Sequence, residues 1–331
     1  MENVPGMASG GHSSILESLI AEFEMAGYQM IQPPRVLNAA NFGVPQDRRR
    51  LILVGAREGE RLPCYPLPTV QPRPKRAVIS SANQIQQMFV ESDLPIGPTV
   101  WDALGDLPDL DRFQELLSAD AVWLGTNALH AIEERSSLYA RTLRGLIPDA
   151  NDWSYPRAWN RQMLTSSLRT EHTELSIRRF AATAPGQTEP VSRFYRLDPA
   201  GLSNTLRAGT GSEHGAYTSP RPIHPVLPRV ISVREAARLH SFPDWFRLHS
   251  TKWHGFRQIG NSVPPLLGRA FAAEIAKALE ITPILPRTST EPGQANLLYL
   301  NMSEAAEHFG ARRESIPQPR RRVANQVKEV A

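Results

Sequence analysis

Glu2, Arg48 and Arg50 are residues near the start of the 331-residue sequence whose types could do chemistry. A carboxylic acid held in a dry pocket has a raised pKa and can donate a proton near neutral pH, as Glu2 could. Arg48 and Arg50 follow Gln46 in alternating order, so at strand spacing their side chains share one face. The arginine fork suits a base carbonyl oxygen or phosphates. Taken alone, however, a single glutamate or an arginine triplet is more often solvated surface.

A second candidate site lies near the other end of the sequence. Gly260-Asn261-Ser262 predicts a turn, and Pro264 and Pro265 are set to open a helix over Leu266–Leu279. A glycine-led turn that feeds a helix N-terminus, with small polar side chains beside exposed amides, suits a polar or anionic ligand. A bare Gly-Asn-Ser is nevertheless an ordinary turn, so its meaning depends on its neighbours.

The elements that must position these residues are predicted by local patterns. Apolar residues at helical spacing predict a helix over Ser14–Met25, and Tyr28–Gln32 and Arg35–Asn38 are expected to be extended. Leu51–Val54 is typical of a strand buried in a parallel or mixed sheet. Residues 1–57 therefore predict the tail of a doubly wound α/β domain, with too few strands to complete a sheet alone.

Upstream of the glycine turn, residues 229–244 predict a short helix that stops before Phe242-Pro243-Asp244. Ser232 is its expected N-cap, and Glu235, three residues later, is the expected partner in a capping box. The inner face is expected to consist of Ala236, Ala237 and Leu239.

Four of these stretches, in this order, resemble sequence blocks of the cytosine-5 DNA methyltransferases. The four blocks are Glu2-Asn3-Val4-Pro5-Gly6, Asn38 through Arg50 with its Gln-x-Arg-x-Arg pattern, Arg234-Glu235-Ala236-Ala237-Arg238-Leu239 with Phe242-Pro243-Asp244, and Gly260-Asn261-Ser262-Val263-Pro264-Pro265. The resemblance implies a partial doubly wound, Rossmann-like domain that depends on S-adenosylmethionine, plus a mixed target recognition domain. The implied organisation is residues 1–60 in the catalytic domain, 61–76 as proline-rich linker, 77–228 as recognition domain, 229–280 returning to the catalytic domain, and 281–331 as a tail, with disorder as one alternative.

The resemblance also implies residue roles. Glu2 would be the acid that protonates or hydrogen-bonds ring nitrogen 3 of a cytosine flipped out of duplex DNA, which helps a cysteine thiolate to add at carbon 6. Arg48 and Arg50 would belong to the base pocket, with either one open as the base contact. The implied S-adenosyl-L-methionine pocket includes Asn261, Ser262 and Val263, and the implied DNA contacts are Arg196, Thr205 and Arg207. Arg234 and Glu235 are expected to be structural.

Two blocks of that family, the Phe-x-Gly-x-Gly cofactor turn and the Pro-Cys-Gln nucleophile block, have no match here. Cys64 follows a proline, yet Tyr65 stands where the family has glutamine, and the position in the block order is wrong. The expected function is thus the C-terminal part of a DNA (cytosine-5-)-methyltransferase, inactive until an N-terminal half supplies these blocks. The alternatives are a DNA-binding remnant without catalysis and a truncated gene product.

Composition sets weaker bounds. A net charge of +4 and a pI near 9.4 permit a polyanionic partner such as duplex DNA. The single cysteine fits a reducing cytoplasm, no apolar run is long enough to span a membrane, and the nine histidines show no metal-ligand spacing. A short helix is expected at Met302–Phe309, followed by a basic cluster at Arg320-Arg321-Arg322.

Overall fold

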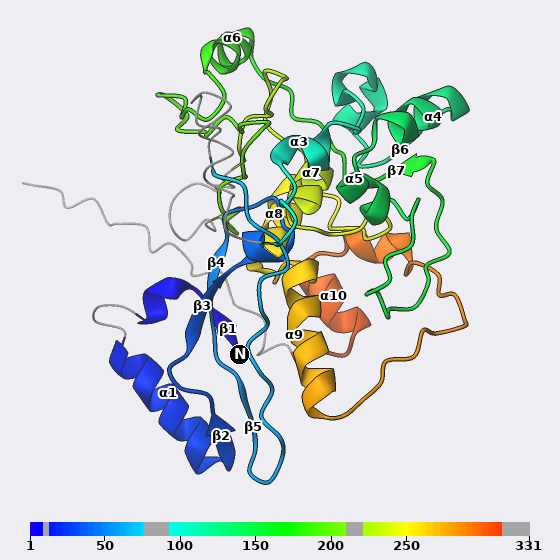
Figure 1. Ribbon diagram of the computed structural model, residues 1–331. Coiled ribbons are helices and arrows are strands. Elements are labelled where there is room, and N and C mark those ends of the chain that lie inside the picture. The colour runs from blue at the N-terminus through cyan, green and yellow to red at the C-terminus, as the bar shows by residue number, and fades with distance from the viewer. Residues whose placement is uncertain (9–12, 76–92, 210–220, 313–331) are drawn as a thin grey trace, which may run out of the picture.

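The computed structural model describes residues 1–8, 13–75, 93–209 and 221–312 (Figure 1). The N-terminal part is built on a three-stranded sheet with the order β1-β4-β3. Its strands are β1 (Glu2–Asn3), β3 (Arg35–Asn38) and β4 (Arg49–Ile52). A second sheet pairs β2 (Tyr28–Met30) with β5 (Gly55–Arg57).

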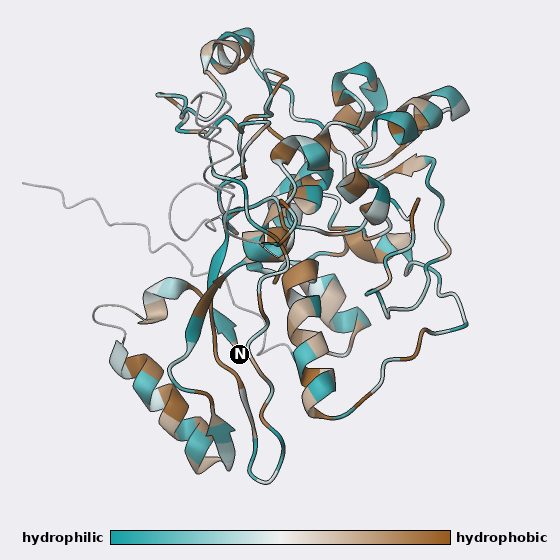
Figure 2. Ribbon diagram, in the orientation of Figure 1, coloured by the Kyte–Doolittle hydropathy of each residue, from teal (hydrophilic) through white to brown (hydrophobic). Residues whose placement is uncertain are grey.

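The helix α1 (Ser13–Met25) confirms the predicted N-terminal helix and packs on these strands. Figure 2 shows apolar and polar residues alternating around α1, which is the pattern of a helix with one buried face. Leu16 and Ile20 of that face pack against Leu51 and Leu53 of the sheet region.

The strands that flank β4 run opposite to it, which differs from the parallel or mixed sheet expected for Leu51–Val54. Glu2 lies opposite Ile52, and Arg35 lies opposite the same residue on the other side. The segment between β3 and β4 is shorter than the roughly dozen residues that a parallel crossover needs, so the chain turns back antiparallel through the 3-10 helix η3 (Ala39–Phe42). The doubly wound arrangement therefore stays a prediction.

The helix α9 (Pro265–Ala278) returns to the N-terminal sheet, as predicted (Figure 1). Leu267 packs against Phe42 and Val44, and Phe271 packs against Ile52. The segment that carries the first two blocks and the helix that follows the last block therefore pack against each other.

The helix α7 (Val233–Leu239) is the centre of the largest apolar cluster. Its predicted capping box is confirmed, because the Ser232 side chain accepts from the amide of Glu235 and the Glu235 carboxylate accepts from the amide of Ser232. Every residue of α7 is buried, and its neighbours are α3 (Val100–Leu104) and α8 (Lys252–Asn261). Because α3 belongs to the middle of the chain, α7 joins this middle region to the late blocks.

The middle region consists mainly of short elements. They are η4 (Leu110–Arg112), η5 (Gln114–Leu117), β6 (Val122–Trp123), α4 (Thr126–Arg135), α5 (Leu138–Leu143), β7 (Met163–Leu164) and α6 (Glu174–Ala182). The weak helical pattern at Asp111–Leu117 therefore forms two 3-10 turns. The pattern at Ser80–Glu91 and the cluster Arg320–Arg322 lie outside the described residues.

The described part of the tail, 281–312, packs on the middle region. Thr290 pairs with the backbone at Pro156 and Ala158, and the Tyr299 hydroxyl lies 3.1 Å from an oxygen of Asp120. The predicted short helix is present as α10 (Met302–His308), which follows η7 (Ala295–Tyr299). No helix in the described part of the chain is long and apolar enough to cross a membrane.

Candidate active site

Glu2 and Arg50 form an ion pair across neighbouring strands. Oε1 of Glu2 lies 2.7 Å from Nε of Arg50. Since Glu2 lies opposite Ile52, Arg50 is its diagonal neighbour on the same face of the sheet. Arg50 is 8% exposed, and burial lowers its pKa while Glu2 opposes that shift. The structure thus brings together two of the three predicted catalytic residues.

Arg48 has a different environment. It is 1% exposed, and its guanidinium donates to the backbone oxygens of Leu206 at 3.0 Å, Gly260 at 2.8 Å and Ser262 at 2.9 Å. Burial, followed by repulsion from Arg50, lowers the pKa of Arg48 to about 9. These contacts give Arg48 a scaffolding role and argue against its predicted place in the base pocket.

The predicted turn at Gly260-Asn261-Ser262 is instead the end of α8, with Ser262 as the C-cap. A Cβ on Gly260 would lie 2.2 Å from the backbone nitrogen of Ala208, because the segment at Arg207–Ala208 crosses directly over it. The glycine is therefore required for a close approach of two backbones, rather than for the geometry of a turn.

The predicted cofactor residues lie where α8 meets α9. Asn261 is exposed, and Val263 is 36% exposed. The Ser262 hydroxyl is already satisfied by the backbone oxygen of Ile259 at 2.8 Å, and α9 starts with Pro265 without a side-chain cap. The amide of Leu266, the first N–H of α9, donates to Oγ of Ser241 at 3.2 Å. The exposed Asn261 amide and the exposed Val263 side chain together fit one edge of a ligand with polar and apolar parts.

Gln46 and His240 are buried partners that the sequence did not single out. The Gln46 oxygen accepts from the amide of Leu206 at 3.2 Å, so its Nε2 must be the group that faces Nδ1 of His240 at 3.1 Å. His240 Nε2 faces the carbonyl of Ser262 at 3.1 Å and must donate to it. Only the neutral ring satisfies both contacts, in accord with burial lowering its pKa well below the usual value. The Gln-x-Arg-x-Arg pattern was the available signal for Gln46.

The three predicted DNA contacts differ in exposure. Arg196 is 7% exposed, and its guanidinium donates to five backbone oxygens. These acceptors are the carbonyls of Phe180, Ala181, Thr183, Pro225 and Val226. Because its guanidinium donors are occupied by these carbonyls, Arg196 has a scaffolding role, which argues against a contact with DNA. The Thr205 hydroxyl donates to the carbonyl of Asp47 at 2.6 Å, and Arg207 is exposed.

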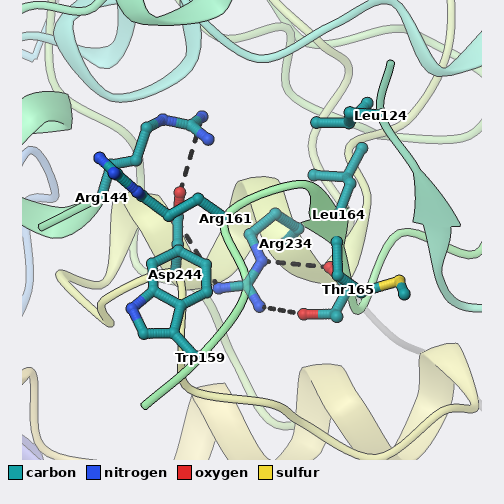
Figure 3. A pocket seen from close by; sticks show the side chains of 9 residues that line it. Leu124, Arg144, Trp159, Arg161, Leu164, Thr165, Arg234 and Asp244 are labelled. Carbon is teal, nitrogen blue, oxygen red and sulfur yellow. Dashed lines mark hydrogen bonds and ion pairs between the residues drawn. The ribbon is translucent and has the colours of Figure 1, made fainter. Parts of the chain in front are cut away.

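Arg234 and Glu235 have the structural roles expected for them. Arg229 forms a two-pronged ion pair with the Glu235 carboxylate at 2.8 and 2.9 Å. Burial would raise the pKa of Glu235, but Arg229 outweighs burial and lowers it to about 2. Figure 3 shows the small pocket where Arg234 reaches Thr165 and Asp244 contacts Arg144. Its charged groups are held by protein partners, so we read it as scaffolding.

Cys64 is exposed, while the next side chain, Tyr65, turns inward and donates to the carbonyl of Ile52 at 2.7 Å. This places the thiol at the surface of the linker. Within the described ranges, no group of three or more His, Cys, Asp or Glu residues could hold a metal ion.

Residues 1–277 match a family model described as C-5 cytosine-specific DNA methylase. The chain is 50% identical over 309 residues to the type II methyltransferase M.XorII of Xanthomonas oryzae pv. oryzae, with 93% of this chain and 65% of that protein covered. The chain therefore spans somewhat less than two thirds of the length of this relative.

Two further likenesses agree with this match. The type II methyltransferase M.AgeI of Thalassovita gelatinovora is 29% identical over 84% of this chain and 73% of its own length. A crystal structure described as that of a DNA modification methyltransferase encoded within an E. coli prophage superposes with a TM-score of 0.56 at 28% identity, covering 84% of this chain and 68% of the other.

Proposed function

Because the chain belongs to the family of C-5 cytosine-specific DNA methylases, we propose that it supplies the base-binding, target-recognition and late cofactor blocks of a DNA (cytosine-5-)-methyltransferase. The observation that carries the proposal is the Glu2–Arg50 ion pair, which places a carboxylate and a guanidinium next to each other on one face of the sheet. The type II relatives favour a role in restriction-modification.

The proposed base pocket uses Arg50 and Glu2 together. Arg50 would donate to the carbonyl oxygen of a flipped cytosine, and Glu2 would act at ring nitrogen 3, where a proton makes carbon 6 more electrophilic. Arg48 would act indirectly, because its donors hold the carbonyls of Leu206, Gly260 and Ser262. A cysteine thiolate of the complementing segment would supply the nucleophile for carbon 6 and the cofactor would supply the methyl group for carbon 5, while Glu2 and Arg50 would bind and orient the base.

S-adenosyl-L-methionine is the proposed cofactor, and it supplies an electrophilic methyl group. Asn261 and Val263, both exposed where α8 meets α9, would bind its edge. Ser262 would only shape this edge, since its hydroxyl, amide and carbonyl are all bonded within the protein. Thr205 and Arg207 would contact the DNA backbone beside them.

The nucleophile is proposed to come from a complementing segment that carries the Pro-Cys-Gln and Phe-x-Gly-x-Gly blocks. Cys64, the one cysteine in the sequence, lies exposed in the linker, and no residue in the described ranges forms a hydrogen bond or an ion pair with its thiol. The same segment would complete the doubly wound sheet whose last elements are the strands and helix of residues 1–60. The recognition domain is proposed to span 77–228, joined to this body by α7.

The test is methyl transfer from labelled S-adenosylmethionine to mixed duplex DNA, with the chain alone and with a co-expressed N-terminal half. We expect activity only in the mixture. Activity from the chain alone would overturn the rejection of Cys64, and a Cys64→Ser variant would check it. Binding to DNA without transfer in either sample would favour the alternative of a DNA-binding remnant.

A further inference from the structure

Two cationic side chains, Arg221 and Lys252, and the backbone of a third cationic residue, Arg169, come together beside the start of α8. The lysine Lys252 is the first residue of that helix, and its Nζ donates to the backbone oxygen of Arg169. Nη1 of Arg221 lies 3.5 Å from Oγ1 of Thr170. We call Arg169, Arg221 and Lys252 the α8 cationic cluster; all three are partly buried and partly open to solvent.

Only one member of the α8 cationic cluster has a carboxylate partner. Arg169 pairs with Asp111 at 2.9 Å, whereas neither Arg221 nor Lys252 forms an ion pair with another described residue. The buried Nε of Arg221 has no hydrogen-bond partner there. Burial, followed by the charge of Arg221, lowers the pKa of Lys252 to about 8. Two unneutralised cations held close together are unfavourable, and an anion between them would offset that cost.

The neighbouring histidine does not supply the missing acceptor. His172 Nε2 accepts from the amide of Val230 at 3.2 Å, so the ring is held by the backbone. Burial, then Arg221 and Lys252, lower the pKa of His172, which keeps the ring neutral. The positive charge of the cluster is therefore left to Arg221 and Lys252.

The helix α8 connects this cluster to the candidate active site. Lys252 begins α8, and Gly260, whose carbonyl is held by Arg48, lies near its end. At 1.5 Å per residue, α8 is about 15 Å long, which corresponds to roughly four base-pair steps of 3.4 Å. A duplex whose target base reaches Arg50 could thus present a backbone phosphate at the cluster.

We propose that the α8 cationic cluster binds a backbone phosphate of duplex DNA that flanks the target cytosine. The proposal rests on the proposed function, since it assigns the partner from the same substrate. The Nζ of Lys252 keeps donors beyond its bond to Arg169, and the Arg221 fork presents its remaining N–H groups to an oxyanion. Such a contact adds affinity that does not depend on sequence.

The experiment measures duplex binding by the full chain, with its complementing half, across a salt series. We expect Lys252→Gln and Arg221→Gln each to weaken binding by a similar factor on every duplex sequence. Each should reduce the salt slope of log Kd by about one. The matched control is Arg61→Gln. Arg61 lies at the start of the linker, carries the same charge, is exposed and pairs with Glu280.

The outcomes separate the two proposals. If the wild-type protein binds duplex DNA but the Lys252 and Arg221 variants keep its affinity and salt slope, the cluster is not a phosphate site and the proposed function stands. If the wild-type protein binds no duplex DNA, both proposals fail. Thermal unfolding is the second readout, because a purely structural role predicts a lower Tm, whereas removal of an unpaired cation should leave Tm unchanged or raised. Lys252→Arg should keep the slope.

Discussion

Oε1 of Glu2 lies 2.7 Å from Nε of Arg50, and the antiparallel pairing of β1 with β4 is what brings them together. Arg48, two residues before Arg50, contacts instead three carbonyls from two other segments. Two arginines that look equivalent in the sequence thus have different environments. Arg50 lies at the candidate base pocket, whereas Arg48 holds the backbone segments beside it.

Replacement of Glu2 tests the pocket. We expect Glu2→Gln to lower methyl transfer in the complemented system by roughly 10²-fold or more, because the proton donor is lost. The β1–β4 pairing is made by the backbone and should persist. Single-turnover rates at saturating cofactor measure the effect, with the exposed Glu60→Gln as control. Equal rates for Glu2→Gln and wild type would remove Glu2 from the catalytic site.

Gly260 offers a sharp stability test. Gly260→Ala should lower the free energy of unfolding by roughly 1–3 kcal/mol, because its Cβ would collide with the backbone of Arg207–Ala208. The matched control is Gly268→Ala in α9, whose Cβ would meet only Val263 at 3.9 Å. That change should be neutral or stabilise by up to about 1 kcal/mol. Urea unfolding compares them, and an equal effect of both would contradict the backbone crossing.

Arg196 and Arg207 should separate scaffolding from DNA contact. Arg196→Lys keeps the charge but loses the fork that holds five carbonyls, so we expect a lower Tm with little change in intrinsic DNA affinity. Arg207→Gln, at an exposed position, should leave Tm unchanged and weaken DNA binding. Thermal unfolding and duplex binding on the same samples decide, and the reverse pattern would restore Arg196 as the DNA contact.

Buried histidines should make the fold sensitive to acid. Burial lowers the pKa of His224 to about 4 and of His240 well below 6.5, so the unfolded chain binds more protons than the folded chain below about pH 6.5. Stability is therefore full above that pH and is lost as pH falls toward 4, with His224 alone contributing on the order of 3 kcal/mol. Glu235, with its pKa lowered to about 2, adds a further loss below about pH 4.5.

Urea unfolding at successive pH values checks this dependence. His240→Gln should flatten the upper part of the profile, because its side chain no longer has to be kept neutral. The control His130→Gln removes an exposed histidine on α4 and should leave the profile unchanged. A stability that stays constant between pH 7 and pH 4 in the wild type would contradict the buried neutral rings.

Sequence patterns were sufficient to predict the family blocks and the elements whose causes are local. The capping box of Ser232 and Glu235, the proline start of α9 and the apolar face of α1 depend on residues within a few positions of each other. The packing of α9 on the N-terminal sheet was also predicted, because the order of the blocks implied it.

Which polar groups contact one another depends on how distant segments pack in the fold. The acceptors of Arg48 come from the backbone at Leu206, Gly260 and Ser262, and the neutral state of His240 depends on Gln46. Backbone carbonyls carry no residue identity, so no sequence pattern marks them as partners. A buried guanidinium takes its role from the acceptors that the fold gathers around it, which is why Arg48, Arg50 and Arg196 could not be told apart beforehand.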